Sequence, residues 1–227
     1  MKEKELTQIC VSVMVEEVDR VLEKMYRARD EGADLLEWRL DVTRAPEVEI
    51  ILPQSPLPVI ATVRSVEQGG HFQGTRQEQL RLLIRAATSG SSYIDWEFRP
   101  GEPLPKELSI MKERLILSHH DLEQTPTNNE LESLFDQMAA LSTGLVKVVT
   151  LAQRMEDNIS LLNLIGRGRK RGIKVVSFCL GPLGRISRLS CLLMGGAFTY
   201  AALEIGAEAG PGQLTLAKMR QLLELLK

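Results

Sequence analysis

The chain has 227 residues, of which 44% are apolar and 26% are charged. This balance is typical of a soluble globular protein with enough apolar side chains to form a core. The 28 basic residues are matched by 30 acidic ones, giving a net charge of −2. That charge argues against a nucleic-acid-binding surface, because such surfaces carry a basic excess.

No segment suggests insertion into a membrane or export. The longest stretch without a charged residue, 189–203, contains two glycines and is shorter than the roughly 20 apolar residues of a membrane-spanning helix. The first residues, MKEKEL, are unlike the apolar core of a signal peptide. Cys10, Cys179 and Cys191 are far apart in apolar segments, so we expect buried, reduced thiols. These features predict a cytoplasmic protein.

Eight short segments rich in β-branched residues predict strands. In chain order they are ICVSVM (9–14), LLEWRL (35–40), PVIATV (58–63), YIDWEF (93–98), RLILSH (114–119), LVKVVT (145–150), IKVVSF (173–178) and AFTYAA (197–202). Most are separated by segments with helical periodicity. Between 35–40 and 58–63 the segment is short and contains prolines, which predicts only a turn or two of helix.

Capping signals support these helices. Thr75 with Glu78, and Thr127 with Glu130, have the spacing of capping boxes. Gly32 and Gly172 stand where two of the helices should end.

The alternation of strands and helices predicts parallel strands joined by right-handed crossovers. Eight such units close into a (β/α)₈ TIM barrel. An open, doubly wound sheet is the alternative, but no segment has the glycine pattern of a dinucleotide site. The chain shows no linker and no internal repeat, so we expect a single domain over residues 1–227.

Charged residues lie within or at the end of several predicted strands: Glu37, Arg39, Arg64, Asp95, Glu97 and Lys147. Because side chains alternate along a strand, Glu37 and Arg39 share one face while Leu36 and Trp38 share the other. The outer face of a barrel packs under helices, so we expect the charges to point inward. Buried charges are costly unless they are paired. Stability alone does not explain so many of them.

Structural and functional interpretations of these charges both stay open. A single inward Glu–Arg pair is as often structural as functional, and we expect Asp95 and Glu97 mainly to pair with inward cations. Lys147 differs, because an inward amine beside arginines has a lowered pKa. A neutral amine is what a Schiff-base nucleophile needs. The pattern alone leaves a catalytic and a structural Lys147 equally open.

His119 and His120 end the fifth predicted strand, and only one of two adjacent residues can face the interior. At the rim of a barrel, beside an inward lysine, a histidine is as well suited to acid/base catalysis as to a structural hydrogen bond.

These residues stand in motifs that follow one another in a known order. They are EWR at 37–39, RSVEQGG at 64–70, HD at 120–121, Lys147, ISR at 186–188 and PGQ at 211–213. With these motifs the chain resembles type I 3-dehydroquinate dehydratase (3-dehydroquinase), the Schiff-base dehydratase of the shikimate pathway. The resemblance covers nearly the whole chain. It implies a TIM barrel that converts 3-dehydroquinate to 3-dehydroshikimate, the third step of chorismate synthesis, without a cofactor or a metal.

The resemblance also implies roles for particular side chains. Lys147 forms the imine with the substrate ketone, and His120 is the general acid/base. The implied substrate-binding residues are Ser12, Glu37, Arg39, Arg64, Arg188 and Gln213. Gln213 stands in a loop rich in glycine and proline, which we expect to close over the mouth of the barrel.

Three residues depart from the family pattern. Gln68 replaces a frequent glutamate near the catalytic histidine, Leu180 replaces a methionine near the imine, and Ala209 replaces a substrate-contacting serine. The hairpin that plugs the barrel in some members is expected to be absent, because the first strand starts near Gln8. The resemblance implies a homodimer. Related domains occur fused to shikimate dehydrogenase, so a domain of a longer fused protein is a second interpretation of the chain.

Two other functions are alternatives to the dehydratase. Another Schiff-base barrel enzyme, such as an aldolase for phosphorylated sugars, would show a glycine-rich phosphate loop after its last strands. GPLG at 181–184 is only a weak candidate for such a loop. A non-catalytic binding barrel would leave Lys147 and His120 unexplained. The dehydratase is therefore the prediction.

Overall fold

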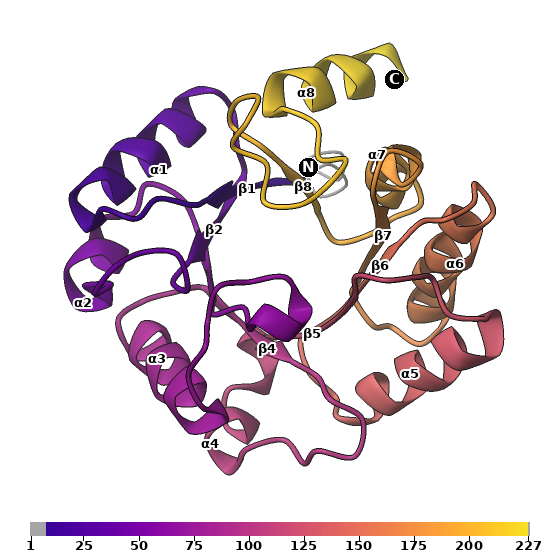
Figure 1. Ribbon diagram of the computed structural model, residues 1–227, viewed down its shortest axis with the longest axis horizontal. Helices are drawn as coiled ribbons and strands as arrows, with labels where there is room; N and C mark the ends of the chain where they lie inside the picture. The colour runs from indigo at the N-terminus through magenta and orange to yellow at the C-terminus, as the bar shows by residue number, and fades with distance from the viewer. Residues whose placement is uncertain (1–7, 227) are drawn as a thin grey trace.

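In the computed structural model, which describes residues 8–226, eight parallel strands alternate with helices around a barrel (Figure 1). The strands are β1 (Ile9–Val13), β2 (Leu35–Arg39), β3 (Val59–Thr62), β4 (Tyr93–Glu97), β5 (Leu115–Asp121), β6 (Leu145–Leu151), β7 (Val175–Leu180) and β8 (Thr199–Ala201). They pair in the order β7-β6-β5-β4-β3-β2-β1-β8. A backbone hydrogen bond of 2.8 Å from Ala197 N to Val175 O joins the two remaining edges. The predicted (β/α)₈ barrel is confirmed, and the doubly wound alternative is wrong.

The helices form the outer ring in Figure 1. They are α1 (Val21–Asp30), α2 (Val48–Ile51), α3 (Arg76–Thr88), α4 (Lys106–Ser109), α5 (Asn128–Ala140), α6 (Asp157–Lys170), α7 (Arg185–Leu193) and α8 (Leu216–Leu225). Short 3₁₀ turns are η2 (Val18–Arg20), η3 (Leu52–Gln54), η4 (Val66–Gln68) and η5 (Lys112–Arg114). The connection from β2 to β3 holds only α2 and η3, as the proline-broken segment predicts.

The predicted capping signals act at the ends of these helices. Both capping boxes are formed: Thr75 caps α3 with Glu78, and Thr127 caps α5 with Glu130. Gly32 and Gly172 follow α1 and α6 with φ values of 93° and 69°. A side chain is strained in this left-handed region, so glycine is the favoured residue at both helix ends.

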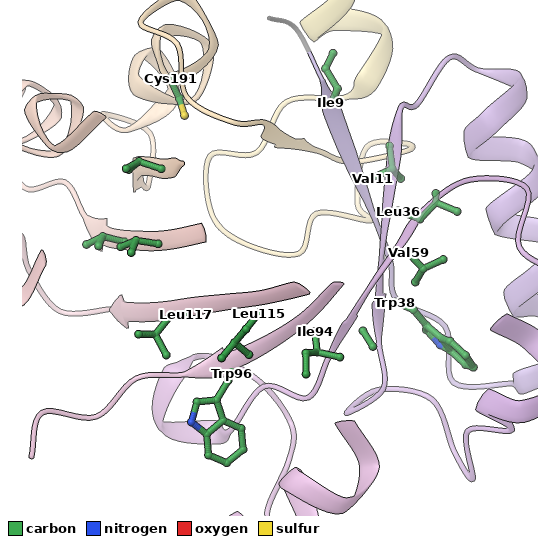
Figure 2. Packing of buried hydrophobic residues seen from close by; sticks show 14 of the residues in the cluster. Ile9, Val11, Leu36, Trp38, Val59, Ile94, Trp96, Leu115, Leu117 and Cys191 are labelled. Carbon is green, nitrogen blue, oxygen red and sulfur yellow. The ribbon is translucent and has the colours of Figure 1, made fainter. Parts of the chain in front are cut away.

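Two apolar clusters lie on either side of the strands. The larger one contains Leu36, Trp38, Trp96 and Leu117 and fills the space between strands and helices. Figure 2 shows Trp38 and Trp96 projecting away from the strands toward the helices. The smaller one contains the alternate residues and lies inside the ring of strands: Cys10, Leu35, Ile60, Ile116, Leu145, Val149, Val176, Phe178, Leu180, Phe198 and Tyr200. The predicted alternation is confirmed, because the charged residues share the inner face with the smaller cluster.

The remaining fold predictions concern the cysteines, the plug hairpin and membrane-spanning helices. Cys10, Cys179 and Cys191 are free and buried, as expected. The absent plug hairpin concerns residues 1–7, which lie outside the described residues. Among residues 8–226, no helix combines the length and apolar character that crossing a membrane requires.

Two glycines of α6 lead to opposite expectations for stability. A Cβ added at Gly166 meets no atom within 4 Å, whereas one added at Gly168 would lie 2.3 Å from Val175 Cγ2. Alanine favours a helix over glycine by about 1 kcal/mol. We therefore expect Gly166→Ala to raise the free energy of unfolding by about 0.5–1 kcal/mol. Gly168→Ala should lower it by about 1–3 kcal/mol through overpacking. Urea unfolding of both variants checks this, and shifts of the same sign would contradict the packing of α6 on β7.

Candidate active site

A pocket of about 320 Å³ opens at the carboxyl end of the barrel strands. All eight residues predicted from the sequence line it: Ser12, Glu37, Arg39, Arg64, His120, Lys147, Arg188 and Gln213. They come from β1, β2, the end of β3, β5, β6, α7 and the loop between β8 and α8. The barrel thus brings together side chains that are spread over 200 residues of sequence.

Lys147 is only 4% exposed and is surrounded by acceptors. Its Nζ lies 3.2 Å from Asp95 Oδ2, 3.6 Å from Glu37 Oε1 and 2.9 Å from the Tyr200 hydroxyl. Its immediate contacts are thus two carboxylates and a phenol. Arg64, which follows β3, binds the other oxygen of Asp95, because β3 and β4 are neighbours in the barrel.

The inward carboxylates are held by several donors. Glu37 accepts hydrogen bonds from Ser12 Oγ at 2.9 Å and from Thr62 Oγ1 at 3.1 Å. Glu97 accepts from Ser65 N at 2.8 Å and lies 3.4 Å from Arg64 Nη1. These contacts fix Glu37 beside Lys147 and Glu97 beside Arg64.

Asp95 stays ionised although it is completely buried. Burial opposes its ionisation, but the positive charges of Arg64 and Lys147 outweigh burial and lower the pKa of Asp95. The prediction that Asp95 and Glu97 pair with inward cations agrees with this network.

Arg39 forms a two-point ion pair with Asp41 through Nε at 2.8 Å and Nη2 at 2.7 Å. Asp41 also accepts hydrogen bonds from the backbone N–H groups of Arg64 and His71. It therefore ties the end of β2 to the loop that follows β3. The sequence analysis missed Asp41, although it continues the alternation of Glu37 and Arg39 and thus belongs to the same face.

Gln68 sets the tautomer of His120. Gln68 Oε1 lies 3.1 Å from His120 N and 3.2 Å from His120 Nδ1. A backbone N–H can only donate, so the side-chain atom facing it must be the oxygen, and Nδ1 must then carry a proton to donate to it. Neutral His120 is left with a free lone pair on Nε2, the form that a general base needs.

Burial, together with the positive charges of Arg64 and Lys147, holds the pKa of His120 well below its ordinary value. Both effects favour the neutral imidazole over the imidazolium. His119 does not line the pocket, and its Nδ1 faces the backbone oxygen of Phe98 at 3.5 Å. The prediction that only one of the two histidines faces the interior is confirmed.

Arg188 is a buried cation without an acidic partner among residues 8–226. Its Nη2 donates to Pro211 O at 3.0 Å, its guanidinium lies 4.6 Å from the centre of the Phe178 ring, and its Nε has no hydrogen-bond partner. Burial lowers the pKa of Arg188 to about 10. A guanidinium that faces a pocket in this state is suited to bind a carboxylate from outside the protein.

Gln213 belongs to a loop that is fastened to the rim of the pocket. Its Oε1 accepts a hydrogen bond of 2.7 Å from Ala209 N, and Pro211 O accepts one of 3.0 Å from Gly181 N. Ala209, Leu180 and Gln68 also line the pocket, so all three residues that depart from the family pattern lie in its wall. Closure of this loop over a substrate stays a prediction.

Tyr200 of β8 is a pocket residue that the sequence analysis did not single out. The alternation of AFTYAA, with Phe198 and Tyr200 on one face, is the signal that could have found it. As for metal ions, residues 8–226 contain no group of three or more His, Cys, Asp or Glu side chains that could hold one.

Known proteins resemble this chain over almost its full length. A family model described as Type I 3-dehydroquinase matches residues 9–227. The 3-dehydroquinate dehydratase of Syntrophobacter fumaroxidans is 36% identical over 204 residues, which cover 86% of this chain and 87% of that protein. The crystal structure of 3-dehydroquinate dehydratase from Geobacillus kaustophilus has a TM-score of 0.83 at 26% identity and covers 96% of this chain and 90% of that chain.

The same fold occurs in a longer protein. The structure described as dehydroquinate dehydratase and shikimate dehydrogenase from S. pombe AroM has a TM-score of 0.78 at 23% identity. It covers 99% of this chain and 45% of that chain. The family match decides against the aldolase and the non-catalytic barrel. The chain belongs to the type I 3-dehydroquinase family.

Proposed function

We propose that this enzyme dehydrates 3-dehydroquinate to 3-dehydroshikimate through a Schiff base on Lys147, with His120 as general acid/base. One pocket holds a buried amine, an imidazole with a free Nε2 and a buried guanidinium that has no acidic partner in the described part of the chain, and this combination carries the proposal. The substrate offers a ketone, a C–H bond beside it and a carboxylate, which match these three groups.

The imine makes removal of the C2 proton possible. Beside a ketone this proton is only weakly acidic, whereas a protonated imine accepts the electron pair and forms an enamine. Lys147 must lose one proton before it attacks the C3 ketone, since an ammonium is not a nucleophile. Asp95 and Glu37 then stand beside the positive charge of the protonated imine and stabilise it.

His120 is suited to move the protons. Its low pKa keeps Nε2 free to take the C2 proton, and the imidazolium that results is a strong acid beside the departing C1 hydroxide. The oxygen of Gln68 keeps the ring in position through both transfers. It supplies a hydrogen bond without the negative charge that a glutamate would add.

The substrate-binding roles follow from the atoms of each side chain that its contacts within the protein leave unbonded. Arg188 binds the carboxylate, and Gln213 contacts the carboxylate or the C1 hydroxyl through the amide nitrogen that the Ala209 contact leaves free. Arg39 keeps Nη1 outside its pair with Asp41 and can reach a substrate hydroxyl. Arg64 binds Asp95 and Glu97, so it acts by holding these carboxylates in place, while Ser12 does the same for Glu37.

We also propose that the barrel acts as a homodimer in the cytoplasm. Exposed apolar side chains on the neighbouring helices α6 and α7 support a protein interface, namely Ile159, Ile186 and Leu193. The likeness to the S. pombe protein supports an arrangement in which such a barrel stands beside a shikimate dehydrogenase. Catalysis by the single domain 1–227 is proposed for either arrangement.

The Schiff base is tested by reduction. We expect borohydride, added with 3-dehydroquinate, to fix an adduct on the peptide that contains Lys147, as seen by mass spectrometry. Lys147→Met should give no adduct and lower kcat by about 10⁴-fold or more, because the electron sink is lost. The exposed Lys174 supplies the control, and Lys174→Met should leave both readouts unchanged. Substantial turnover by Lys147→Met would refute the mechanism.

The role of Gln68 is tested by the pH dependence of kcat/KM. Activity requires neutral His120 and is lost as the pH falls through its lowered pKa. Gln68→Glu places a negative charge beside Nδ1 and raises the pKa of His120, so the acidic limb should move upward by about one to three pH units. Glu67→Gln, at a neighbouring exposed carboxylate, should leave the limb in place. A limb that does not move in Gln68→Glu would rule out His120 as the titrating base.

Arg188 should be necessary for binding and unfavourable for stability. Arg188→Met removes a buried, unpaired cation, so we expect the free energy of unfolding to rise by about 1 kcal/mol. KM should rise about 100-fold or more, because a two-point contact with a carboxylate is lost. Arg167, which is paired with Asp136 on the surface, is the control. Arg167→Met should leave KM unchanged and should not raise the free energy of unfolding. An unchanged KM in Arg188→Met would assign the carboxylate to another residue.

A further inference from the structure

The hydroxyl of Tyr200 contacts the nitrogen atom that performs the proposed chemistry. Tyr200 Oη lies 2.9 Å from Lys147 Nζ, a closer approach than that of either carboxylate. The side chain is 4% exposed and points inward from β8, opposite the outward-facing Ala201. None of the motifs in the sequence contains it.

The aromatic ring is held in place independently of the hydroxyl. It packs edge-on against Phe178, with the ring centres 6.1 Å apart, and against Phe198, with the centres 5.4 Å apart. Lys147 Nζ also lies 4.4 Å from the ring centre. The hydroxyl is therefore positioned by its ring and does not depend on the lysine for its place.

Tyr200 remains a neutral phenol in this position. Burial and the negative charges of Glu37 and Asp95 raise its pKa well above the ordinary value. It is thus not a general base. A phenol can, however, both accept and donate a hydrogen bond. Among the three groups close to Nζ, the carboxylates of Asp95 and Glu37 can only accept when ionised, so Tyr200 alone has a proton to donate.

These two properties match what imine formation requires. The ammonium of Lys147 donates to Tyr200 Oη in the free enzyme. When the neutral amine attacks, the C–N bond forms, the electron pair of the C=O bond moves to oxygen, and this oxygen lies one carbon away from Nζ. A hydroxyl in contact with Nζ is within reach of that oxygen and can donate to it.

We propose that Tyr200 is a further catalytic residue, specific for the formation and hydrolysis of the imine; this rests on the proposed Schiff-base function. Its hydroxyl accepts from the ammonium before attack and donates to the carbinolamine oxygen afterwards. The amine, the ketone and one proton give the protonated imine and water. The proton that the Lys147 ammonium loses before attack passes to the neutral His120, which then returns it to the departing oxygen. Tyr200 supplies a hydrogen bond to that oxygen and is unchanged at the end. Removal of the C2 proton does not use Tyr200.

The test separates the imine step from the later steps. Tyr200→Phe keeps the ring and its packing and removes only the hydroxyl. With 3-dehydroquinate in single-turnover experiments quenched by borohydride, we expect the adduct on Lys147 to form about 10- to 100-fold more slowly than in the unaltered enzyme, as for the loss of one hydrogen bond to a charged group. We expect kcat to fall similarly and KM to change little. The fraction of enzyme trapped as adduct during steady turnover should also fall. A replacement of His120 should have the opposite effect and raise that fraction.

Tyr93 supplies the matched control, because it stands at the first position of β4 and has no contact with Lys147 among the described hydrogen bonds. Tyr93→Phe should form the adduct at the normal rate. Adduct formation at the normal rate in Tyr200→Phe would overturn the role of Tyr200 while leaving the Schiff base intact. Absence of an adduct in the unaltered enzyme would instead overturn the proposed function itself.

Discussion

The ion pair between Lys147 and Asp95, inside the barrel, is the contact on which the rest of the site depends. An ammonium in a protein interior is tolerated only if its charge is balanced, and breaking a buried pair is far more costly than losing an exposed one. Asp95 provides this balance, and Arg64 on the neighbouring strand in turn balances Asp95. Each of these residues occupies an inward position of its strand or of the strand's end, so the network requires a closed ring of strands with a regular alternation of side chains.

Arg188 stands outside this balance. Every inward cation of the strands has a carboxylate, whereas Arg188, on α7, has only a backbone oxygen and an aromatic ring among the described contacts. A protein that optimised stability alone would pair this cation or remove it. Under the proposed function, this charge raises the affinity for the substrate, because the substrate carboxylate supplies the missing partner. In this proposal the buried charge of Arg188 lowers the free energy of unfolding and increases the binding energy for the substrate.

The reacting groups are held by rigid elements and the outer contacts by loops. Lys147, Asp95 and Tyr200 lie on strands, where packing on both faces limits their movement. Gln68 and Gln213 lie in the connections after β3 and β8. Gln68 is held by two contacts of its Oε1 with His120, and Gln213 is held by the hydrogen bond from Ala209 N. Placing the reacting groups on strands and the outer contacts on loops suits a site whose reacting groups must stay in fixed positions while a substrate enters and leaves.

The sequence by itself determined the alternation of strands and helices, the inward direction of the charged residues and the positions of the helix caps, because each depends on periodicity or on spacing within a few residues. The motif order also identified the family. Only the tertiary structure decided which side chains meet. Asp95 and Tyr200 are 52 and 53 residues away from Lys147, and their contact with it depends on strand register and ring closure across the barrel. For this reason the sequence did not reveal which groups surround Lys147, and Tyr200 was missed. The tautomer of His120 likewise follows from one amide oxygen that folding brings from 52 residues away.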